Sequence, residues 1–295
     1  MGYLEDRANL SGKVAAVVGG ASGVGAAVTL ALAHAGVDIA FCDIKRDAVE
    51  STRAEVDQLG RRVTGRVTDA LEPEQLAAFY EAFDDDFDRL DIVVNVVGGV
   101  LQRHFADTSV EQWTADIHRN LGWAMQSMSL AIPRIRAGGR GGSIVSFTTI
   151  EAHRGAAGFA AYAGAKAGLT NFSRALAVEL GPERIRVNLI APDTTPSEGS
   201  TNAIPEELRA AIPRAPREIV GKTFAMYVPM GAPPPVDDLG DAVLFLASDL
   251  SSSITGTTLH VDGGTWAASG FLHWPGPLGW MPAPPAGLLR PEVFD

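Results

Sequence analysis

Short, almost wholly apolar runs alternate along this sequence with longer stretches whose apolar residues recur at helical spacing, and this alternation limits the fold more than any other feature. The apolar runs, which we predict to be strands, are residues 13–19, 37–42, 62–67, 91–97, 143–148, 186–190 and 257–261. The helical stretches are residues 23–35, 46–59, 73–86, 110–136, 158–180 and 237–247. Because strands that alternate with helices form βαβ units, the pattern predicts an α/β fold with a doubly wound, mainly parallel, seven-stranded sheet and helices on both faces.

No linker or internal repeat divides this alternation, so residues 1–295 are predicted to form a single domain. The predicted helix 110–136 is expected to bend near Pro133. Residues 193–235, which are rich in proline, and the tail 270–295 fall outside the alternation. The tail carries large apolar side chains that we expect to be buried, namely Phe271, Trp274, Trp280, Leu288 and Leu289.

Charge and cysteine content exclude several classes of function. The net charge of −11 argues against nucleic acid and against an anionic membrane surface as partners, because both are bound by basic patches. Cys42 is the single cysteine, which excludes an internal disulfide and fits a reducing compartment. The N-terminus is polar, and no run approaches the roughly 20 apolar residues of a membrane span. We therefore expect a cytoplasmic protein, and we assign no residue to a metal site.

A glycine-rich turn joins the first predicted strand to the first predicted helix. Residues 18–25 read Val-Gly-Gly-Ala-Ser-Gly-Val-Gly, with the glycine spacing G-x-x-x-G-x-G. Glycine lets the backbone turn sharply and approach a pyrophosphate, whose charge the helix N-terminus attracts. The turn therefore predicts a Rossmann-like dinucleotide site, and the residues that we assign to it are Gly19, Ser22, Gly23, Val24 and Gly25.

An acidic residue, Asp43, follows the second predicted strand. A carboxylate at this position accepts hydrogen bonds from the ribose hydroxyls of NAD and repels the 2′-phosphate of NADP. Lys45 and Arg46 lie close by and offer the alternative of binding that phosphate. We rank Asp43 above them because it is closer to the expected ribose, and we predict that the cofactor is NAD.

Tyr162 and Lys166 are four residues apart in the predicted helix 158–180, and this spacing places them on one face. Such a pair is usually a packed ring and a solvated amine. However, a cation about 5 Å from the phenol, at an effective dielectric of about 20, favours tyrosinate by roughly 3 kcal/mol, or about two pKa units. We therefore expect Lys166 to lower the pKa of Tyr162, which would make Tyr162 a general acid–base group.

Further motifs stand in the order expected for one family. They are Asn95 to Gly98 (Asn-Val-Val-Gly), Asn120 in the predicted helix 110–136, Ile185 to Pro192, and Val261 to Gly264. With the glycine turn and the Tyr/Lys pair, they resemble the short-chain dehydrogenase/reductase family of the common single-domain type, over about residues 9–264. The resemblance implies a small-molecule alcohol or ketone substrate, NAD as cofactor, and a homotetramer.

The resemblance also implies roles for individual residues. Tyr162 would exchange the substrate's hydroxyl proton, Lys166 would hold the nicotinamide ribose, and Asn120 would hold a water that relays the proton. Where the family has a serine that orients the substrate oxygen, this chain has Thr149, which keeps the hydroxyl and adds a methyl group. The resemblance also assigns contacts with the cofactor to Val67, Asn95, Pro192 and Thr195.

Some positions depart from the family pattern. They are Val18, Val96, Arg66 and Asp193. Together these departures leave open the alternative that this chain is a non-catalytic relative of the family, which binds the cofactor as a sensor or scaffold without turnover. A second alternative is a 3-oxoacyl thioester reductase, although Asp43 and the charge of −11 both argue against it.

The substrate pocket is expected to be built by residues 99–105, 150–159 and 193–235, with the tail 270–295 packed over its mouth or on a neighbouring subunit. Its predicted lining is apolar and contains Val100, Leu101, Phe105, Ile150, Phe159, Phe224, Met226 and Tyr227. This composition favours an apolar, cyclic alcohol such as a terpenoid, a steroid or a dihydrodiol. Four polar residues of these segments, which could anchor a substrate, are expected instead to be solvated: His104, Glu151, His153 and Arg154.

Overall fold

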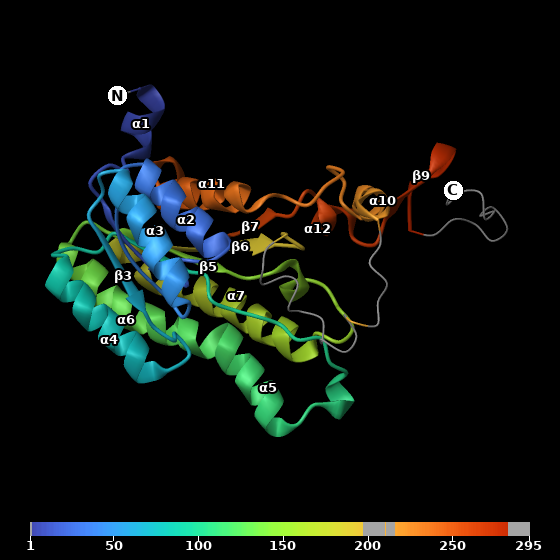
Figure 1. Cartoon of the computed structure of the whole chain (residues 1–295), viewed down its shortest axis with the longest axis horizontal. Helices are drawn as coiled ribbons and strands as arrows, with labels where there is room; N and C mark the ends of the chain where they lie inside the picture. Colours follow the sequence, from blue (N-terminus) through green and yellow to red (C-terminus); the bar gives the residue numbers. More distant parts are fainter. Residues whose placement is uncertain (1, 197–209, 211–215, 283–295) are drawn as a thin grey trace.

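The structure is a computed structural model that describes residues 2–196, 210 and 216–282. One sheet in this part of the chain is wholly parallel, with the strand order β3-β2-β1-β4-β5-β6-β7 (Figure 1). Its strands are β1 (Val14–Val18), β2 (Asp38–Asp43), β3 (Val63–Val67), β4 (Ile92–Asn95), β5 (Gly142–Phe147), β6 (Ile185–Pro192) and β7 (Thr258–Val261). The predicted doubly wound, parallel, seven-stranded sheet is confirmed.

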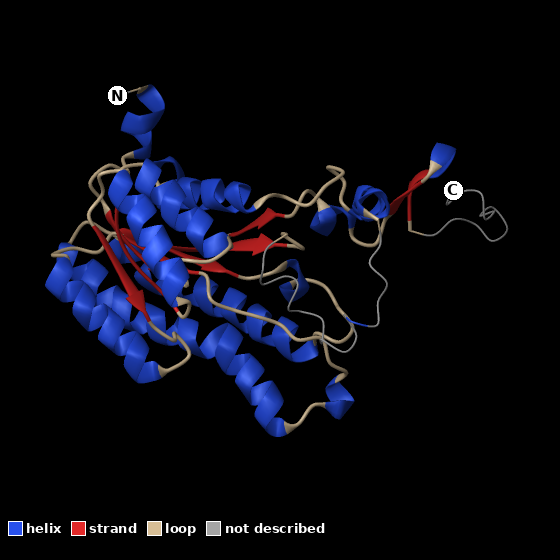
Figure 2. Ribbon diagram, viewed as in Figure 1, coloured by secondary structure: helices blue, strands red, loops and turns tan. Residues whose placement is uncertain are grey.

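Helices cover both faces of the sheet, as predicted (Figure 2). One face carries α2 (Val24–His34), α3 (Arg46–Gln58) and α11 (Val236–Ala247), and the other carries α4 (Pro73–Asp86), α5 (Val110–Ile117), α6 (Trp123–Gly138) and α7 (Ala160–Leu180). The shorter helices are α1 (Tyr3–Ala8), α10 (Arg217–Tyr227) and α12 (Thr265–Ala268). Within the described ranges, no helix is both long enough and apolar enough to cross a membrane.

The central strand β1 supplies side chains to two separate cores, because successive residues of a strand point to opposite faces. Val14, Ala16 and Val18 join the core beneath α4 and α6. Ala15 and Val17 join the core beneath α2, α3 and α11. A strand buried on both faces needs apolar residues at every position, which is why β1 shows no polar alternation.

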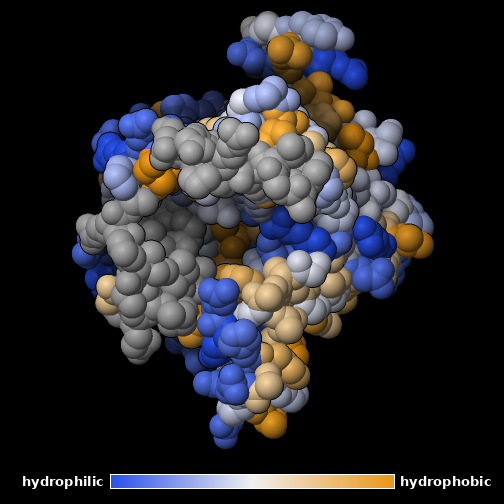
Figure 3. All heavy atoms as spheres, turned by 90° about the vertical axis from the view of Figure 1, so that its right-hand side faces the viewer, coloured by the Kyte–Doolittle hydropathy of each residue, from blue (hydrophilic) through white to orange (hydrophobic). Residues whose placement is uncertain are grey.

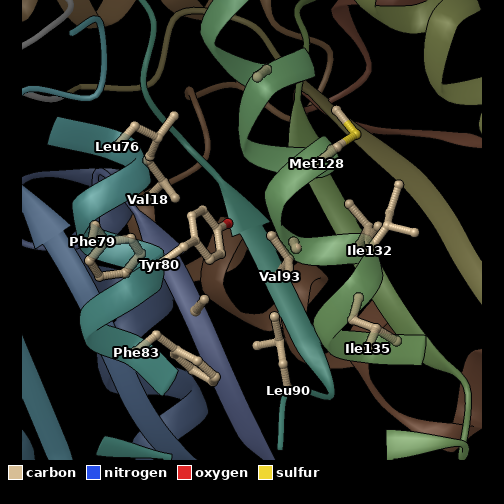
Figure 4. Close-up of a cluster of buried hydrophobic side chains, with 14 of the residues drawn as sticks. Val18, Leu76, Phe79, Tyr80, Phe83, Leu90, Val93, Met128, Ile132 and Ile135 are labelled. Carbon is tan, nitrogen blue, oxygen red and sulfur yellow. The ribbon is translucent and has the colours of Figure 1, made fainter. Parts of the chain in front are cut away.

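The core between α4 and α6 is filled by large side chains that close over β4 (Figure 4). Tyr80 of α4 is fully buried there, and its hydroxyl makes a 2.9 Å hydrogen bond with the Ser127 hydroxyl of α6. This bond removes the cost of burying a phenol oxygen without a partner. Val93, Met128 and Ile135 pack in the same core, so this side of the sheet is a rigid support for the loops that follow β4 and β5.

The strand order reverses at β1, which pairs with β2 on one side and with β4 on the other. Loops that leave the carboxyl ends of these strands diverge to opposite faces and open a crevice between them. Figure 3 views the molecule from the side towards which β6 and β7 point and shows a hollow near its centre.

The predicted helix 110–136 forms, but it is not α-helical throughout. α5 and α6 are separated by a turn of π-helix at His118–Gly122, whereas Pro133 lies inside α6. The side chain of His118 helps to hold this turn through a 2.8 Å hydrogen bond between its Nε2 and the carbonyl of Leu71. Such turns recur at functional sites, and this one carries Asn120.

The described part of the tail, residues 270–282, forms a hairpin, but its aromatic side chains are not all buried, which corrects the expectation from the sequence. β8 (Leu272–Trp274) and β9 (Gly279–Met281) form an antiparallel hairpin, and the indole of Trp274 donates to the Met281 carbonyl at 3.0 Å. Phe271 is 47% exposed and Trp280 is 41% exposed, because the hairpin projects away from the main sheet (Figure 1). Leu288 and Leu289 lie outside the described residues.

Candidate active site

A cavity of about 820 Å³ lies at the carboxyl ends of the strands, where the topology opens the crevice. Loops that follow β1, β2, β3, β4, β5 and β6 all contribute to its wall, together with the start of α7. It brings together most of the residues predicted from the sequence, namely Gly19, Ser22, Gly23, Val24, Asp43, Thr149, Tyr162, Lys166, Pro192 and Thr195.

The glycine turn has the conformation that phosphate binding requires. Gly19 and Gly23 have φ of +83° and +52°, which other residues rarely adopt. A Cβ on Gly25 would lie 1.7 Å from the carbonyl oxygen of Gly19, so only glycine lets the helix start this close to the turn. The Ser22 hydroxyl is buried and has no hydrogen-bond partner within the described chain. These features fit a pyrophosphate held by backbone N–H groups and a serine hydroxyl.

Asp43 lies at the end of β2 beside this turn, as predicted, and is 9% exposed. The backbone N–H groups of Ala21 and Lys45 donate to its two carboxylate oxygens at 3.1 and 3.2 Å. Each oxygen keeps lone pairs for a ribose hydroxyl. Lys45 and Arg46 line an adjacent hollow of about 600 Å³ with Ser22, so the basic alternative for a 2′-phosphate also lies within reach of this end of the cavity.

Lys166 is 3% exposed, and its ammonium donates to the Phe147 carbonyl at 2.8 Å. A Cβ on Gly98 would lie 3.1 Å from Nζ of Lys166 and 3.2 Å from Oδ1 of Asn120. Because Gly98 has no side chain, the Lys166 ammonium and the Asn120 amide can both lie close to the loop after β4. The strand-end loop and α7 together fix the position of the ammonium under the cavity floor.

Asn120 is fully buried beneath the cavity wall and does not line it. Its amide donates to the carbonyls of Gly99 and Asp116 at 2.9 Å each, and its oxygen accepts from the N–H of Gly99 at 3.1 Å. Both amide protons are thus used by backbone groups. In this structure the Asn120 side chain fixes the loop at Gly99 from below.

The expectation that Lys166 lowers the pKa of Tyr162 is wrong for this structure. Burial raises the pKa of Tyr162 to about 12, a hydrogen bond with Thr149 opposes that rise, and the charge of Glu151 adds to it. Burial also lowers the pKa of Lys166 to about 8. Burial takes the charged forms of both side chains out of water, and this cost is larger than the Coulomb attraction between tyrosinate and ammonium.

Glu151 and Arg154 form a polar cluster at the substrate end of the cavity, although both were expected to be solvated. The Thr149 hydroxyl donates to Oε2 of Glu151 in a short hydrogen bond. Arg154 donates to Oε1 of Glu151 at 2.8 Å and to the Tyr227 hydroxyl at 2.7 Å, and it lies 3.7 Å from Asp193. The side chains of Glu151 and Arg154 are only 16% and 29% exposed. The cluster joins the end of β5 to α10.

Two predicted cofactor residues, Val67 and Asn95, do not line the cavity. Val67 ends β3 and is 43% exposed. Asn95 is buried, and its amide bonds instead to the hydroxyls of Ser146 and Ser127 at 3.2 and 2.7 Å. Asn95 therefore holds β4 to β5 and α6, which positions the loop above it without contact to the cavity.

A second group of rings beside the catalytic segment was missed at the sequence level. His153, His260 of β7 and Trp266 of α12 lie with ring centroids 5.0 to 5.5 Å apart. Within the described chain, Nε2 of each histidine is buried without a hydrogen-bond partner. Burial lowers the pKa of both histidines. Because these rings are far apart in the sequence, no local pattern indicates their contact.

Comparison with known proteins gives consistent matches. Residues 19–265 match the family model described as enoyl-(acyl carrier protein) reductase. An uncharacterized oxidoreductase of Mycobacterium tuberculosis is 33% identical over 265 residues, which cover 88% of this chain and 94% of that protein. A 3-oxoacyl-[acyl-carrier-protein] reductase of Chlamydia trachomatis is 32% identical over 257 residues, which cover 86% of this chain and 98% of that protein.

Solved structures with the same fold include two whose bound ligands are known. Carveol dehydrogenase from Mycobacterium avium, in complex with NAD, has a TM-score of 0.81 and 29% identity, with 87% of this chain and 98% of that one covered. A 7α-hydroxysteroid dehydrogenase, in complex with NADH and 7-oxo glycochenodeoxycholic acid, has a TM-score of 0.78 and 27% identity. The match covers 90% of this chain and 98% of that one. Sequence, fold and site geometry agree, and the chain belongs to the short-chain dehydrogenase/reductase family.

Proposed function

We propose that this protein is an NAD-dependent oxidoreductase that interconverts an apolar or cyclic secondary alcohol and its ketone. The observation that carries the proposal is the position of Thr149, Tyr162 and Lys166 in one cavity with the glycine turn and Asp43. When bound, the nicotinamide cofactor supplies the group that accepts or donates the hydride.

In this proposal the protein's own residues bind the substrate oxygen and move its proton. Tyr162, protonated at neutral pH because its pKa is raised to about 12, donates a hydrogen bond to the substrate oxygen. The Thr149 hydroxyl fixes the orientation of that oxygen from the end of β5. Lys166 places a cation beneath them, held by the Phe147 carbonyl.

Asp43 is the basis for proposing NAD in preference to NADP. Its buried carboxylate lies beside the glycine turn, where a second negative charge on a 2′-phosphate would be repelled. Lys45 and Arg46, which line a hollow together with Ser22 and Gly23 of the turn, limit how strong that preference can be.

The 3-oxoacyl reductases among the relatives support a second candidate, reduction of a 3-oxoacyl thioester. We rank it lower because the net charge of −11 disfavours binding to an acidic carrier protein, and because Asp43 disfavours NADP. The carveol and hydroxysteroid dehydrogenases favour the cyclic alcohol, since those two proteins share the fold over most of this chain.

The test is a panel assay in which reduced nicotinamide is followed by its near-ultraviolet absorbance. Cyclic secondary alcohols with NAD, and 3-oxoacyl thioesters with NADH or NADPH, are compared with the binding of each cofactor alone. The proposal expects turnover of at least one cyclic alcohol. Cofactor binding with no turnover across the panel would instead support a sensor, and turnover confined to thioesters would support the reductase.

We also propose that the protein is a homotetramer. Helices α5 to α7 leave large apolar side chains at the surface, with Val110 67% exposed and Val178 81% exposed. Apolar groups of this size on long neighbouring helices are candidates for burial by a second copy. Light scattering at micromolar concentration measures the assembly, and a monomer would refute the proposal.

A further inference from the structure

The π-turn between α5 and α6 borders the cavity, and it holds Arg119 between two anchored neighbours. On one side, Nε2 of His118 bonds with the Leu71 carbonyl at 2.8 Å. On the other side, the Asn120 amide bonds with both the carbonyl and the N–H of Gly99. Leu71 and Gly99 both line the cavity. The backbone of Arg119 is therefore fixed against the cavity wall from both directions.

Arg119 itself lines the cavity and is exposed to solvent. Its side chain runs beside the loop after β4, because a Cβ on Gly99 would lie 3.6 Å from Cδ of Arg119. The same loop touches the glycine turn, since a Cβ on Gly19 would lie 2.7 Å from Cγ2 of Val97. Arg119 and the glycine turn therefore flank one loop of the cavity wall.

The guanidinium of Arg119 has no task in the folded chain. Within the ranges that the structure describes, it makes no hydrogen bond and no ion pair. The Arg119 carbonyl, in contrast, accepts from the indole of Trp123 at 2.9 Å, which helps to hold the π-turn. The ammonium of Lys166, another cation of the cavity, is held by the Phe147 carbonyl. A cation that lines a cavity and has no partner is suited to bind an anionic ligand.

Carboxylates outnumber cations along the cavity, which makes each cation important for an anionic cofactor. The acidic residues that line it are Asp43, Asp69, Glu151 and Asp193, and the cationic ones are Lys45, Arg119 and Lys166. A dinucleotide adds the two negative charges of its pyrophosphate. The glycine turn offers that pyrophosphate N–H groups and the Ser22 hydroxyl, but its residues carry no positive charge. The positive charge must therefore come from outside the turn.

We propose that Arg119 binds the pyrophosphate of the nicotinamide cofactor, an inference that rests on the proposed function. The planar guanidinium presents two N–H donors in parallel, which matches two oxygens of a phosphate group. The pyrophosphate is common to NAD and NADP. Arg119 therefore contributes affinity for either cofactor, whereas Asp43 contributes the choice between them.

The deciding experiment compares the affinity of wild type and Arg119→Gln for three ligands. Titration calorimetry gives Kd for NAD and for ADP-ribose, which keeps the pyrophosphate but lacks the nicotinamide, and NMR titration gives Kd for adenosine, which lacks both. Loss of a charge-assisted hydrogen-bond pair should weaken NAD and ADP-ribose by about tenfold to a hundredfold and adenosine by less than about twofold. Added salt should also weaken NAD binding less in the variant than in the wild type, because an ion pair is screened.

Two further variants separate charge from structure. Arg119→Lys keeps the positive charge without the planar fork and should recover part of the affinity for NAD and ADP-ribose. The matched control is Arg136→Gln, which removes an arginine in the last turn of α6 that pairs with Glu183, and it should leave all three Kd values unchanged. Thermal midpoints without ligand, measured on every variant, show whether the fold is intact.

Each outcome decides a separate question. An Arg119→Gln variant that binds NAD as tightly as the wild type would overturn the role of Arg119, and so would one that weakens adenosine as much as NAD. Either result leaves the proposed function standing. A wild type that binds neither NAD nor ADP-ribose overturns both. If NAD binding depends on Arg119 as expected but no alcohol of the panel is oxidised, the proposed function alone is overturned.

Discussion

The two ends of the cavity are built in different ways. At the cofactor end, a contiguous turn of glycines at residues 19–25 and the backbone bonds of Asp43 make the site. At the substrate end, side chains from separate parts of the chain meet, since Arg154 reaches Tyr227 of α10. The cofactor end therefore depends on backbone geometry that few substitutions tolerate, whereas the substrate end depends on charged side chains that can be replaced singly. The difference predicts that binding and turnover respond to different mutations.

The largest expected effect is at the substrate end, in Tyr162→Phe. The ring and its packing remain, but the hydroxyl that exchanges the proton is gone, so kcat should fall by about a hundredfold to ten-thousandfold. NAD binding, measured by titration calorimetry, should stay close to that of the wild type. Retention of near wild-type kcat would show that another group carries the proton.

A smaller loss is expected when the neighbouring hydroxyl is removed. Thr149→Ala deletes the hydroxyl that bonds Glu151 and that lines the cavity beside Tyr162, and kcat should fall by about tenfold to a hundredfold. Thr149→Ser keeps the hydroxyl and serves as the matched control, with kcat kept or improved. If both variants lost kcat equally, the methyl group and not the hydroxyl would be the part of Thr149 that matters, and if neither lost kcat, Thr149 would have no role in turnover.

The third prediction concerns the cofactor end. Asp43 should favour NAD over NADP by about a hundredfold, because a charge-assisted hydrogen bond to the ribose contributes roughly 1.5–3 kcal/mol. Asp43→Ala should weaken the binding of NAD and narrow the difference in kcat/KM between NAD and NADP. The reason is that Lys45 and Arg46 then face the 2′-phosphate without a competing carboxylate. The measurement is kcat/KM for both cofactors with one alcohol. Equal use of both by the wild type would contradict the role given to Asp43.

The smallest effect is expected from the histidine rings behind the substrate end. Burial lowers the pKa of His153 and His260 below the ordinary value of about 6.5. As the pH falls below that value, the unfolded chain binds protons that the folded chain resists, so stability declines. His260→Gln should reduce this decline between about pH 7 and pH 5 in denaturant titrations. If the free energy of unfolding of the variant declined with falling pH as steeply as that of the wild type, His260 would not contribute to this decline.

The sequence predicts the two ends of the cavity unequally, for a physical reason. The glycine turn and the strand that leads to Asp43 are local patterns, so spacing and composition are enough to find them. The bond between Thr149 and Glu151 depends on the turn of 3-10 helix at Ile150–Ala152, and the contact of Arg154 with Tyr227 joins residues far apart in the chain. The residue types around these positions indicate neither the 3-10 turn nor the long-range contact.

Two errors at the sequence level have the same origin. The stretch 110–136, expected to be α-helical throughout, contains a π-turn around Asn120, and His118 of that turn contacts the Leu71 carbonyl, which is remote in sequence. The pKa of Tyr162 rises where attraction to Lys166 alone predicted a fall. In both cases surroundings that are remote in sequence outweigh the local pattern.

The central claim, hydride transfer between a carbinol carbon and a nicotinamide at this site, is tested most directly by isotope transfer. A secondary alcohol deuterated at its carbinol carbon is incubated with the protein and NAD, and the reduced cofactor is examined by mass spectrometry and by NMR at its C4 position. We expect one deuterium at C4 with the wild type and none with Tyr162→Phe over the same time. Reduced cofactor that carries no deuterium, or no reduced cofactor with any secondary alcohol of the panel, would contradict it.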